Sequence, residues 1–118
     1  MPFAFTDPVG SVLNVALDGV AQRQRVTADN IANLDTPGYR ASSVDFESSL
    51  RAAIAAGDPA AAEPAALLAT DTPVGPNDNN VDLRKETLSA VQSQFQYQIL
   101  TRAVTDRGAW LKAAAGVS

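Results

Sequence analysis

Carboxylates make up almost all the side chains in this sequence of 118 residues that could do acid–base chemistry. The chain has no histidine and no cysteine, so it lacks the commonest general base, the commonest metal ligand and any thiol nucleophile. Asp18 and Asp29 share one face of a helix, but they stand about 16 Å apart along its axis. Because acid–base catalysis needs two titratable groups in contact, we interpret both as solvated surface carboxylates.

Asp78, Asn80 and Asp82 stand at alternate positions, which is the rhythm of a calcium-binding loop. An EF-hand would then need glycine in place of Leu83 and glutamate in place of Ser89, and the chain has neither. We therefore interpret the run as a loop that closes into the N-cap of a helix. No phosphate-binding glycine loop and no G-x-S-x-G motif occurs. The sequence predicts no enzyme, no metal, no cofactor and no small-molecule substrate.

The net charge of −4 belongs to one segment, because residues 57–80 hold four acidic and no basic side chains and the rest is balanced. The basic cluster at 22–25 has only two charges, and we interpret it as the polar face of a helix and not as a nucleic-acid or membrane site. No apolar run approaches the ~20 residues that span a bilayer. The N-terminus lacks the charged and apolar regions of a secretory signal, so we expect no cleaved signal peptide.

The elements that would position these side chains are mostly helices. Asp7 as N-cap and Pro8 as first residue predict the start of a long helix. It should end near Leu34, because Pro37 disfavours a helical conformation at Thr36. Along it, residues at alternating steps of four and three form a seam that predicts a partner helix: Leu13, Leu17, Val20, Gln24, Thr27, Ile31 and Leu34.

A turn and a short helix follow. In Thr36-Pro37-Gly38-Tyr39, proline presets the second position of a type II turn and glycine accepts the positive φ of the third. Phe46, Leu50 and Ile54 recur at four-residue steps, which predicts a short amphipathic helix within 41–56. Residues 57–80 hold four of the seven prolines, and we predict a flexible acidic loop there.

The last helix should begin at Asp82, another good cap. It carries two apolar stripes: Leu88, Val91, Phe95 and Ile99 form one, and Tyr97, Leu100, Val104 and Leu111 form the other. Two stripes predict two buried faces, and a two-helix hairpin covers only one, so the other needs a second chain. We therefore predict an all-α fold in which long N- and C-terminal helices pair as a coiled coil. Its segments are 1–7 (flexible), 8–40 (helix and turn), 41–56 (short helix), 57–80 (loop) and 81–118 (helix).

The segment 30–40 reads Asn-Ile-Ala-Asn-Leu-Asp-Thr-Pro-Gly-Tyr-Arg. Asn30 and Asn33 lie one helical turn apart at the predicted helix end, where their amides can bond backbone groups that the helix leaves free. The segment resembles the signature of the axial rod and hook proteins of bacterial flagella and is most similar to the proximal-rod members of that family. A second match at 79–83 resembles the start of the C-terminal helix in the same proteins.

This resemblance, over about positions 8–56 and 77–115, implies a structural subunit of the flagellar basal-body rod. It implies paired terminal helices stacked around an export channel, a periplasmic position in the basal body, and export by the flagellar type III apparatus without signal cleavage. The implied partners are other copies, other rod subunits, the basal-body adaptor and the export gate. Phe5 and Val9 resemble the element that engages that gate. The residues carried over for assembly are Asn30, Ile31, Asn33, Thr36, Pro37, Gly38 and Tyr39, with Asn80, Val81, Asp82 and Leu83 at the helix start.

Two other hypotheses remain open from the sequence. One stays in the family and makes the chain another axial rod subunit. The other makes it a soluble helical adaptor that binds one partner by laying a helix in a groove, which predicts a one-to-one complex and no polymer. A cell-wall hydrolase is disfavoured, because histidine, cysteine and paired carboxylates are all missing.

Overall fold

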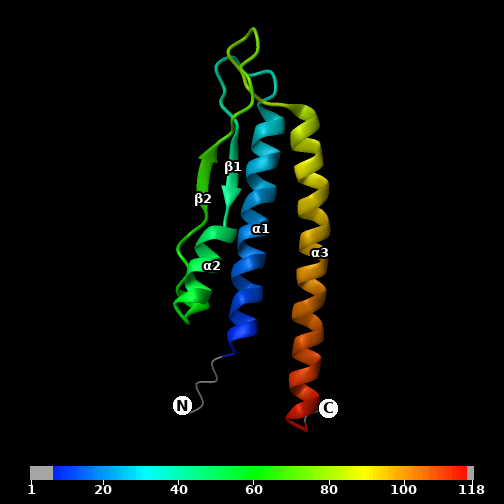
Figure 1. Cartoon of the computed structure of the whole chain (residues 1–118). Helices are drawn as coiled ribbons and strands as arrows, with labels where there is room; N and C mark the ends of the chain where they lie inside the picture. The colour runs from blue at the N-terminus through cyan, green and yellow to red at the C-terminus, as the bar shows by residue number, and fades with distance from the viewer. Residues whose placement is uncertain (1–6, 117–118) are drawn as a thin grey trace.

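The structure is a computed structural model that describes residues 7–116. In chain order it contains α1 (Pro8–Ala32), β1 (Ser42–Asp45), α2 (Glu47–Ala55), the 3-10 turn η1 (Pro59–Ala61), β2 (Ala66–Ala69) and α3 (Leu83–Ala114). The molecule is elongated, 62 × 29 × 19 Å. The two long helices, α1 and α3, lie side by side along its length and run in opposite directions (Figure 1).

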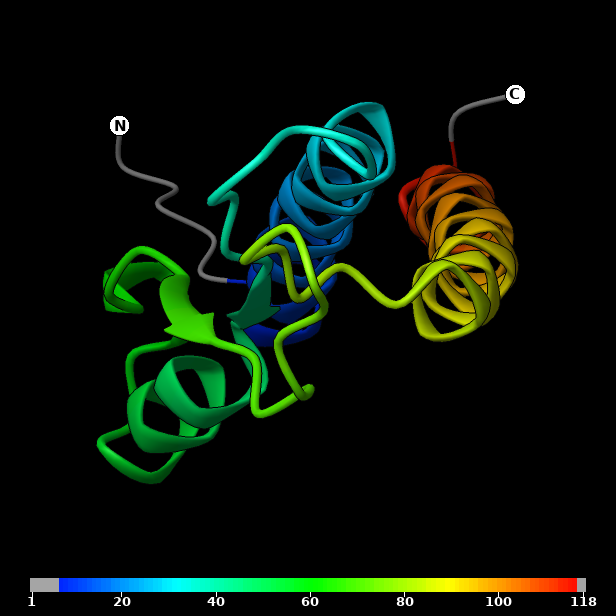
Figure 2. The same cartoon turned by 90° about the horizontal axis from the view of Figure 1, so that it is seen from above.

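The predicted all-α fold is wrong in one respect, because β1 and β2 form a two-stranded antiparallel sheet. Val44 lies opposite Leu67, and Ser42 opposite Ala69. Each strand has only four residues, which is too short for an alternating pattern to stand out in the sequence. β1 occupies the start of the segment predicted as a short helix, and β2 lies in the segment predicted as a loop. Seen along the long helices, this sheet and α2 cover the side of α1 away from α3 (Figure 2).

Both long helices start where the capping residues predicted. Pro8 is the first residue of α1 and Asp7 stands at its N-cap position, but the Asp7 side chain makes no capping hydrogen bond and instead binds Arg107. At α3 the carboxylate of Asp82 accepts hydrogen bonds from the first backbone N–H groups of the helix, at 3.0 and 3.3 Å. After α1, Gly38 has a φ of 77° and the N–H of Tyr39 bonds the oxygen of Thr36, as a type II turn requires.

The hydrophobic core lies between α1 and the β1–α2 segment, not between the two long helices. Its buried members are Ala16, Val20, Val44, Phe46 and Leu50. The ring of Phe46 rests directly on Gly19, where an added Cβ would fall 2.2 Å from a ring atom. Arg23 covers the ring from above, with its guanidinium carbon 4.7 Å from the ring centroid. Glycine at position 19 therefore lets β1 and α2 approach α1 closely.

The interface between α1 and α3 is largely polar near the turn and more apolar toward the other end. Near the turn, the hydroxyls of Thr27 and Ser89 are 3.3 Å apart, and Gln24 bonds Gln94 at 3.4 Å. Leu100, on the same side of α3 farther along, packs against the core from its edge. Small and polar side chains thus hold α3 to α1 over half its length.

Candidate assembly site

Asn30 joins three parts of the chain through all the hydrogen-bonding groups of its side-chain amide. Nδ2 donates to the backbone oxygen of Ser42 at 2.7 Å and to the carboxylate of Glu86. Oδ1 accepts from the backbone N–H of Ser42 and from the hydroxyl of Tyr39, both at 3.2 Å. Asn30 is 1 % exposed. The side chain therefore ties the end of α1 to the chain after the turn and to the first turn of α3.

Three further asparagines hold the turn after α1, and two of them, Asn79 and Asn80, join it to the segment before α3. Asn79 Nδ2 donates to the backbone oxygens of Asn33 and Thr36, each at 2.8 Å. Asn80 Oδ1 accepts from the backbone N–H of Ala41 at 2.6 Å. Asn33 Oδ1 accepts from the hydroxyl of Thr36 at 3.0 Å. We call these three residues, together with Asn30, the asparagine lattice.

Glu86 is a carboxylate that is only 5 % exposed, and its hydrogen-bond partner is the amide of Asn30, not a cation. Burial raises the pKa of the Glu86 carboxyl above its ordinary value, and the bond from Asn30 offsets part of that shift. Burial likewise raises the pKa of the Tyr39 hydroxyl, which keeps that group neutral and able to donate to Asn30.

The two sequence motifs expected to act in assembly come together at one end of the molecule, beside the start of α3 (Figure 1). The N–H of Gly38 donates to the backbone oxygen of Asn77 at 3.0 Å. The guanidinium of Arg40 donates to the carboxylate of Asp78 at 2.7 Å. Segments about 40 residues apart in sequence thus form one hydrogen-bonded tip.

The predicted assembly residues differ in how far their side chains are exposed to solvent. Asn30 and Asn80 are buried, and their side chains are used inside the chain. Ile31, Asn33, Tyr39 and Val81 are half-buried, whereas Thr36, Pro37, Gly38, Asp82 and Leu83 are exposed. Of the two predicted export residues, Val9 is half exposed in the first turn of α1, and Phe5 lies outside the described residues.

Sequence reasoning missed the role of two residues, one at the tip and one in the middle of the molecule. Asn79 belongs to the second match, but nothing in the pattern marks it as buried under the turn. Arg23 was interpreted as part of a solvated polar face, yet its guanidinium donates to the backbone oxygen of Val44 and to Glu47, both at 2.6 Å. A helix pattern cannot tell such an arginine from an exposed one, because its partners lie more than twenty residues away in sequence, in β1 and at the start of α2.

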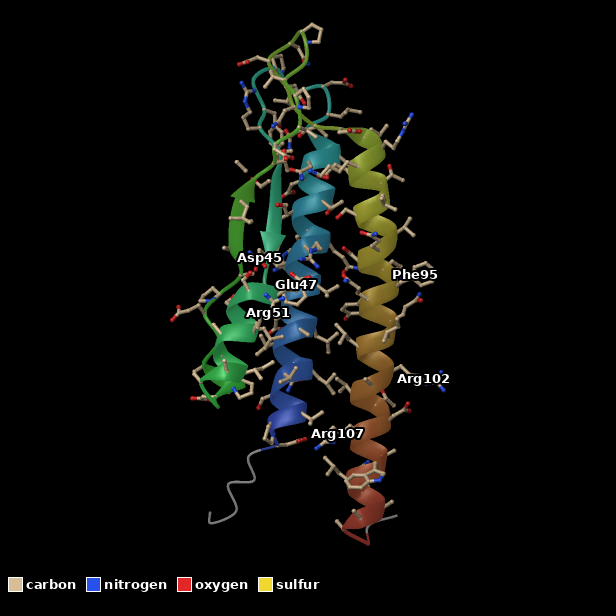
Figure 3. All side chains as sticks on the ribbon, viewed as in Figure 1. Asp45, Glu47, Arg51, Phe95, Arg102 and Arg107 are labelled. Atoms are coloured by element: carbon tan, nitrogen blue, oxygen red, sulfur yellow. The ribbon has the colours of Figure 1, made fainter. Side chains whose placement is uncertain are left out.

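The outer face of α3 exposes a row of large apolar side chains. Leu88, Val91, Phe95 and Ile99 are 58, 49, 61 and 66 % exposed. They lie on the side of the helix away from α1, and Figure 3 shows Phe95 pointing away from the rest of the molecule. The first of the two predicted stripes is therefore uncovered along its whole length. The second is covered only at Leu100 and Val104, because Tyr97 and Leu111 are 40 and 42 % exposed. We call Leu88, Val91, Phe95 and Ile99 the outer stripe.

At the end of the molecule opposite the tip, an ion pair between Asp7 and Arg107 joins α1 to α3. Arg107 Nε donates to the Asp7 carboxylate at 2.9 Å, and Nη2 donates to the same group (Figure 3). The hydrogen bond from Arg107 lowers the pKa of the Asp7 carboxyl, and the carboxylate in turn raises the pKa of Arg107. The pair links the N-cap of α1 to the last third of α3.

Within residues 7–116, no helix is long and apolar enough to cross a membrane. The same part of the chain shows no group of three or more acidic side chains placed to hold a metal ion. The outer stripe offers an exposed apolar surface for packing between subunits, whereas the asparagine lattice is used inside the chain.

Comparison with known proteins agrees with this geometry. Residues 14–40 match the family model described as flagella basal body rod protein. The chain is 34 % identical to the flagellar basal body rod protein FlgB of Escherichia coli over 76 % of its own length and 80 % of that protein. It is 32 % identical to FlgB of Bacillus subtilis over 83 and 87 % of the two chains, and 31 % identical to FlgB of Borreliella burgdorferi over 72 and 78 %. The chain therefore belongs to the FlgB family of flagellar basal-body rod proteins and is a structural subunit of the rod.

Proposed function

We propose that the chain builds the proximal rod by packing the outer stripe of α3 against helices of neighbouring copies and other rod subunits. The observation that carries the proposal is the exposure of the stripe, in which four large apolar side chains are half to two-thirds open to solvent. A soluble protein rarely leaves such a row uncovered unless another surface covers it. Contacts of this kind that do not close on themselves build a helical tube.

The asparagine lattice has a positioning role in this proposal. The side-chain amides of Asn30 and Asn79 make their hydrogen bonds within the chain, so they cannot bond a neighbouring subunit. They fix where α3 starts relative to α1. Thr36, Pro37 and Gly38 at the tip are exposed and would meet the next subunit. In the rod, α1 and α3 then act together as a coiled coil stacked around the channel.

Export and location belong to the same proposal. The chain leaves the cytoplasm through the flagellar type III apparatus without signal cleavage, and Phe5 with Val9 engages the export gate. In the periplasm it joins the basal-body adaptor and the other rod subunits. Family membership supports this route, and the exposure of Val9 leaves its side chain free for a receptor.

The test is a charge placed in the outer stripe. Phe95→Asp should abolish swimming and rod assembly in a strain that carries only this variant, because an aspartate cannot be buried between helices without a partner. Thr101→Asp, exposed on the same helix but off the stripe, is the matched control and should support normal motility. Circular dichroism should show both variants folded. Wild-type swimming by Phe95→Asp would overturn the proposal.

A further inference from the structure

On the outer face of α3, residues at equal distances before and after Phe95 are either alike or complementary. Val91 and Ile99 stand four residues before and after it, and both are apolar. Arg84 and Asp106 stand eleven residues before and after it, and they carry opposite charges. Gln92 and Gln98 flank Phe95 at three residues, and Leu88 and Arg102 flank it at seven. All of these residues are exposed.

Helix geometry puts this pattern on one side of α3. Steps of four, seven and eleven residues return to nearly the same direction, since a turn takes 3.6 residues. Arg84 and Asp106 each lie about 16 Å from Phe95 along the axis, on opposite sides of it. A second copy of α3 laid antiparallel across the first, with a two-fold axis at Phe95, would therefore bring opposite charges together at both ends.

We propose that in the free protein the outer face of α3 is covered by the same face of a second copy, in an antiparallel two-fold dimer. Phe95 meets its own counterpart at the axis, and Val91 of one copy meets Ile99 of the other. The inference rests on the proposed function, because it says what covers the outer stripe before the subunit joins the rod. A two-fold contact closes on itself, so the dimer would keep the subunit from polymerising too early.

The charges favour this arrangement over the parallel one. Asp106 lies 3.7 Å from Arg102 of its own chain, and both side chains are more than two-thirds exposed. In the antiparallel dimer Asp106 stands between this arginine and Arg84 of the other copy, and the aliphatic stem of Arg102 covers Leu88. A parallel dimer in register would place Arg84 against Arg84 and Arg102 against Arg102, which repels.

A charge swap measured by analytical ultracentrifugation tests the dimer. Arg84→Asp and Asp106→Arg should each raise the dimer dissociation constant about tenfold, because two ion pairs are lost and two repulsions appear. The double variant, Arg84→Asp with Asp106→Arg, should bring the constant back to near the wild-type value. A wild-type protein that stays monomeric up to its solubility limit, or a double variant as weak as the single ones, would overturn the proposal.

Disulfide trapping tests the position of the axis, and the chain has no cysteine of its own to interfere. Phe95→Cys should form a disulfide-linked dimer on mild oxidation. Arg84→Cys should cross-link to Asp106→Cys in a mixture, but neither should cross-link to itself. Asp18→Cys, exposed on α1, is the control and should stay monomeric. A Phe95→Cys variant that cross-links no faster than this control would contradict the axis.

The outcomes separate this inference from the proposed function. If Phe95→Asp abolishes motility while the wild-type protein is a monomer, the dimer is wrong and the role of the outer stripe in the rod stands. If the dimer forms as described but Phe95→Asp swims normally, the stripe serves self-association alone and the proposed function is wrong.

Discussion

At the scale of single residues, Asn30 belongs to a family signature that was expected to act in assembly, but its side chain stabilises the fold of its own chain. Its amide uses two donors and its oxygen two lone pairs, all on partners within the chain. This first asparagine of the signature is almost fully buried. Its bonds to Ser42 and Glu86 fix the start of α3 relative to α1.

Asn30→Ala should therefore destabilise the isolated protein by about 3 kcal/mol, because it leaves the backbone groups of Ser42 and the carboxylate of Glu86 without their partner in a buried place. Urea denaturation at pH 7 measures the loss. Asn14→Ala, exposed on the same helix, should change the free energy of unfolding by less than about 0.5 kcal/mol. Equal stability of the two variants would show that the bonds of Asn30 are not needed for the fold.

Glu86 predicts a pH dependence whose sign follows from its raised pKa. The folded chain holds the proton of this carboxyl to a higher pH than the unfolded chain, whose value is near 4.5. Stability should therefore fall as pH rises from the unfolded value through the folded one, and the penalty then persists at neutral pH. Glu86→Gln keeps an acceptor for Asn30, so it should be the more stable protein at pH 7, with the difference shrinking toward pH 4.5.

Urea denaturation between pH 4.5 and pH 7 gives this comparison. Glu63→Gln, which removes an exposed carboxylate, reports the effect of net charge alone. A Glu86→Gln variant that loses stability at pH 7 would mean that the buried charge contributes more through its bond to Asn30 than its burial costs.

At the scale of elements, the close packing of Phe46 on α1 predicts that alanine substitutions at two glycines change stability in opposite directions. Gly19→Ala should destabilise the protein by about 1–2 kcal/mol, because its Cβ would overlap the ring of Phe46 by more than the gain in helix propensity offsets. Gly108→Ala meets nothing within 4 Å and should stabilise α3 by about 1 kcal/mol. Thermal and urea unfolding should show shifts of opposite sign, and a stabilised Gly19→Ala would refute the contact.

The elements also show what the sequence could and could not predict. Both long helices were predicted with starts at Pro8 and Asp82, because capping residues and periodicity are local signals. The sheet was not predicted, since four-residue strands carry no such signal and their pairing spans more than twenty residues. The contact of Asn30 with Glu86 spans 56 residues, so it could be suspected only from the resemblance of both motifs to one family.

Contacts between residues distant in sequence also decide which stripe of α3 stays exposed. The sequence predicted two apolar stripes but not which one meets α1, because that choice depends on the direction in which the tip releases the helix. With Asn79 and Asn80 bonded to the turn after α1, the side that carries Glu86, Ser93 and Leu100 faces inward. The outer stripe then has no cover within residues 7–116.

At the scale of the whole molecule, the fold is held unequally at its two ends. The tip has the asparagine lattice, whereas the far end of α3 has one bidentate ion pair, from Arg107 to Asp7. Beyond Arg107, residues 108–116 are all exposed. The far half of α3 should thus open from α1 more readily than the half near the tip.

Arg107→Ala should make the backbone amides of residues 97–114 exchange faster with deuterium, while amides of 83–93 keep their protection. The substitution removes only the ion pair with Asp7, at the end of the molecule opposite the tip. In the wild-type protein, acid should likewise lower the protection of residues 97–114, measured relative to the intrinsic exchange rates at the same pH. Since Arg107 lowers the pKa of Asp7, the pair contributes stability above the ordinary carboxyl pKa of 3.8 and loses it as pH falls through the lowered value. Arg102→Ala, exposed on the same helix, is the control. Uniform exchange along α3 in every variant would show that the helix opens as one unit and that the Asp7–Arg107 pair does not govern its far half.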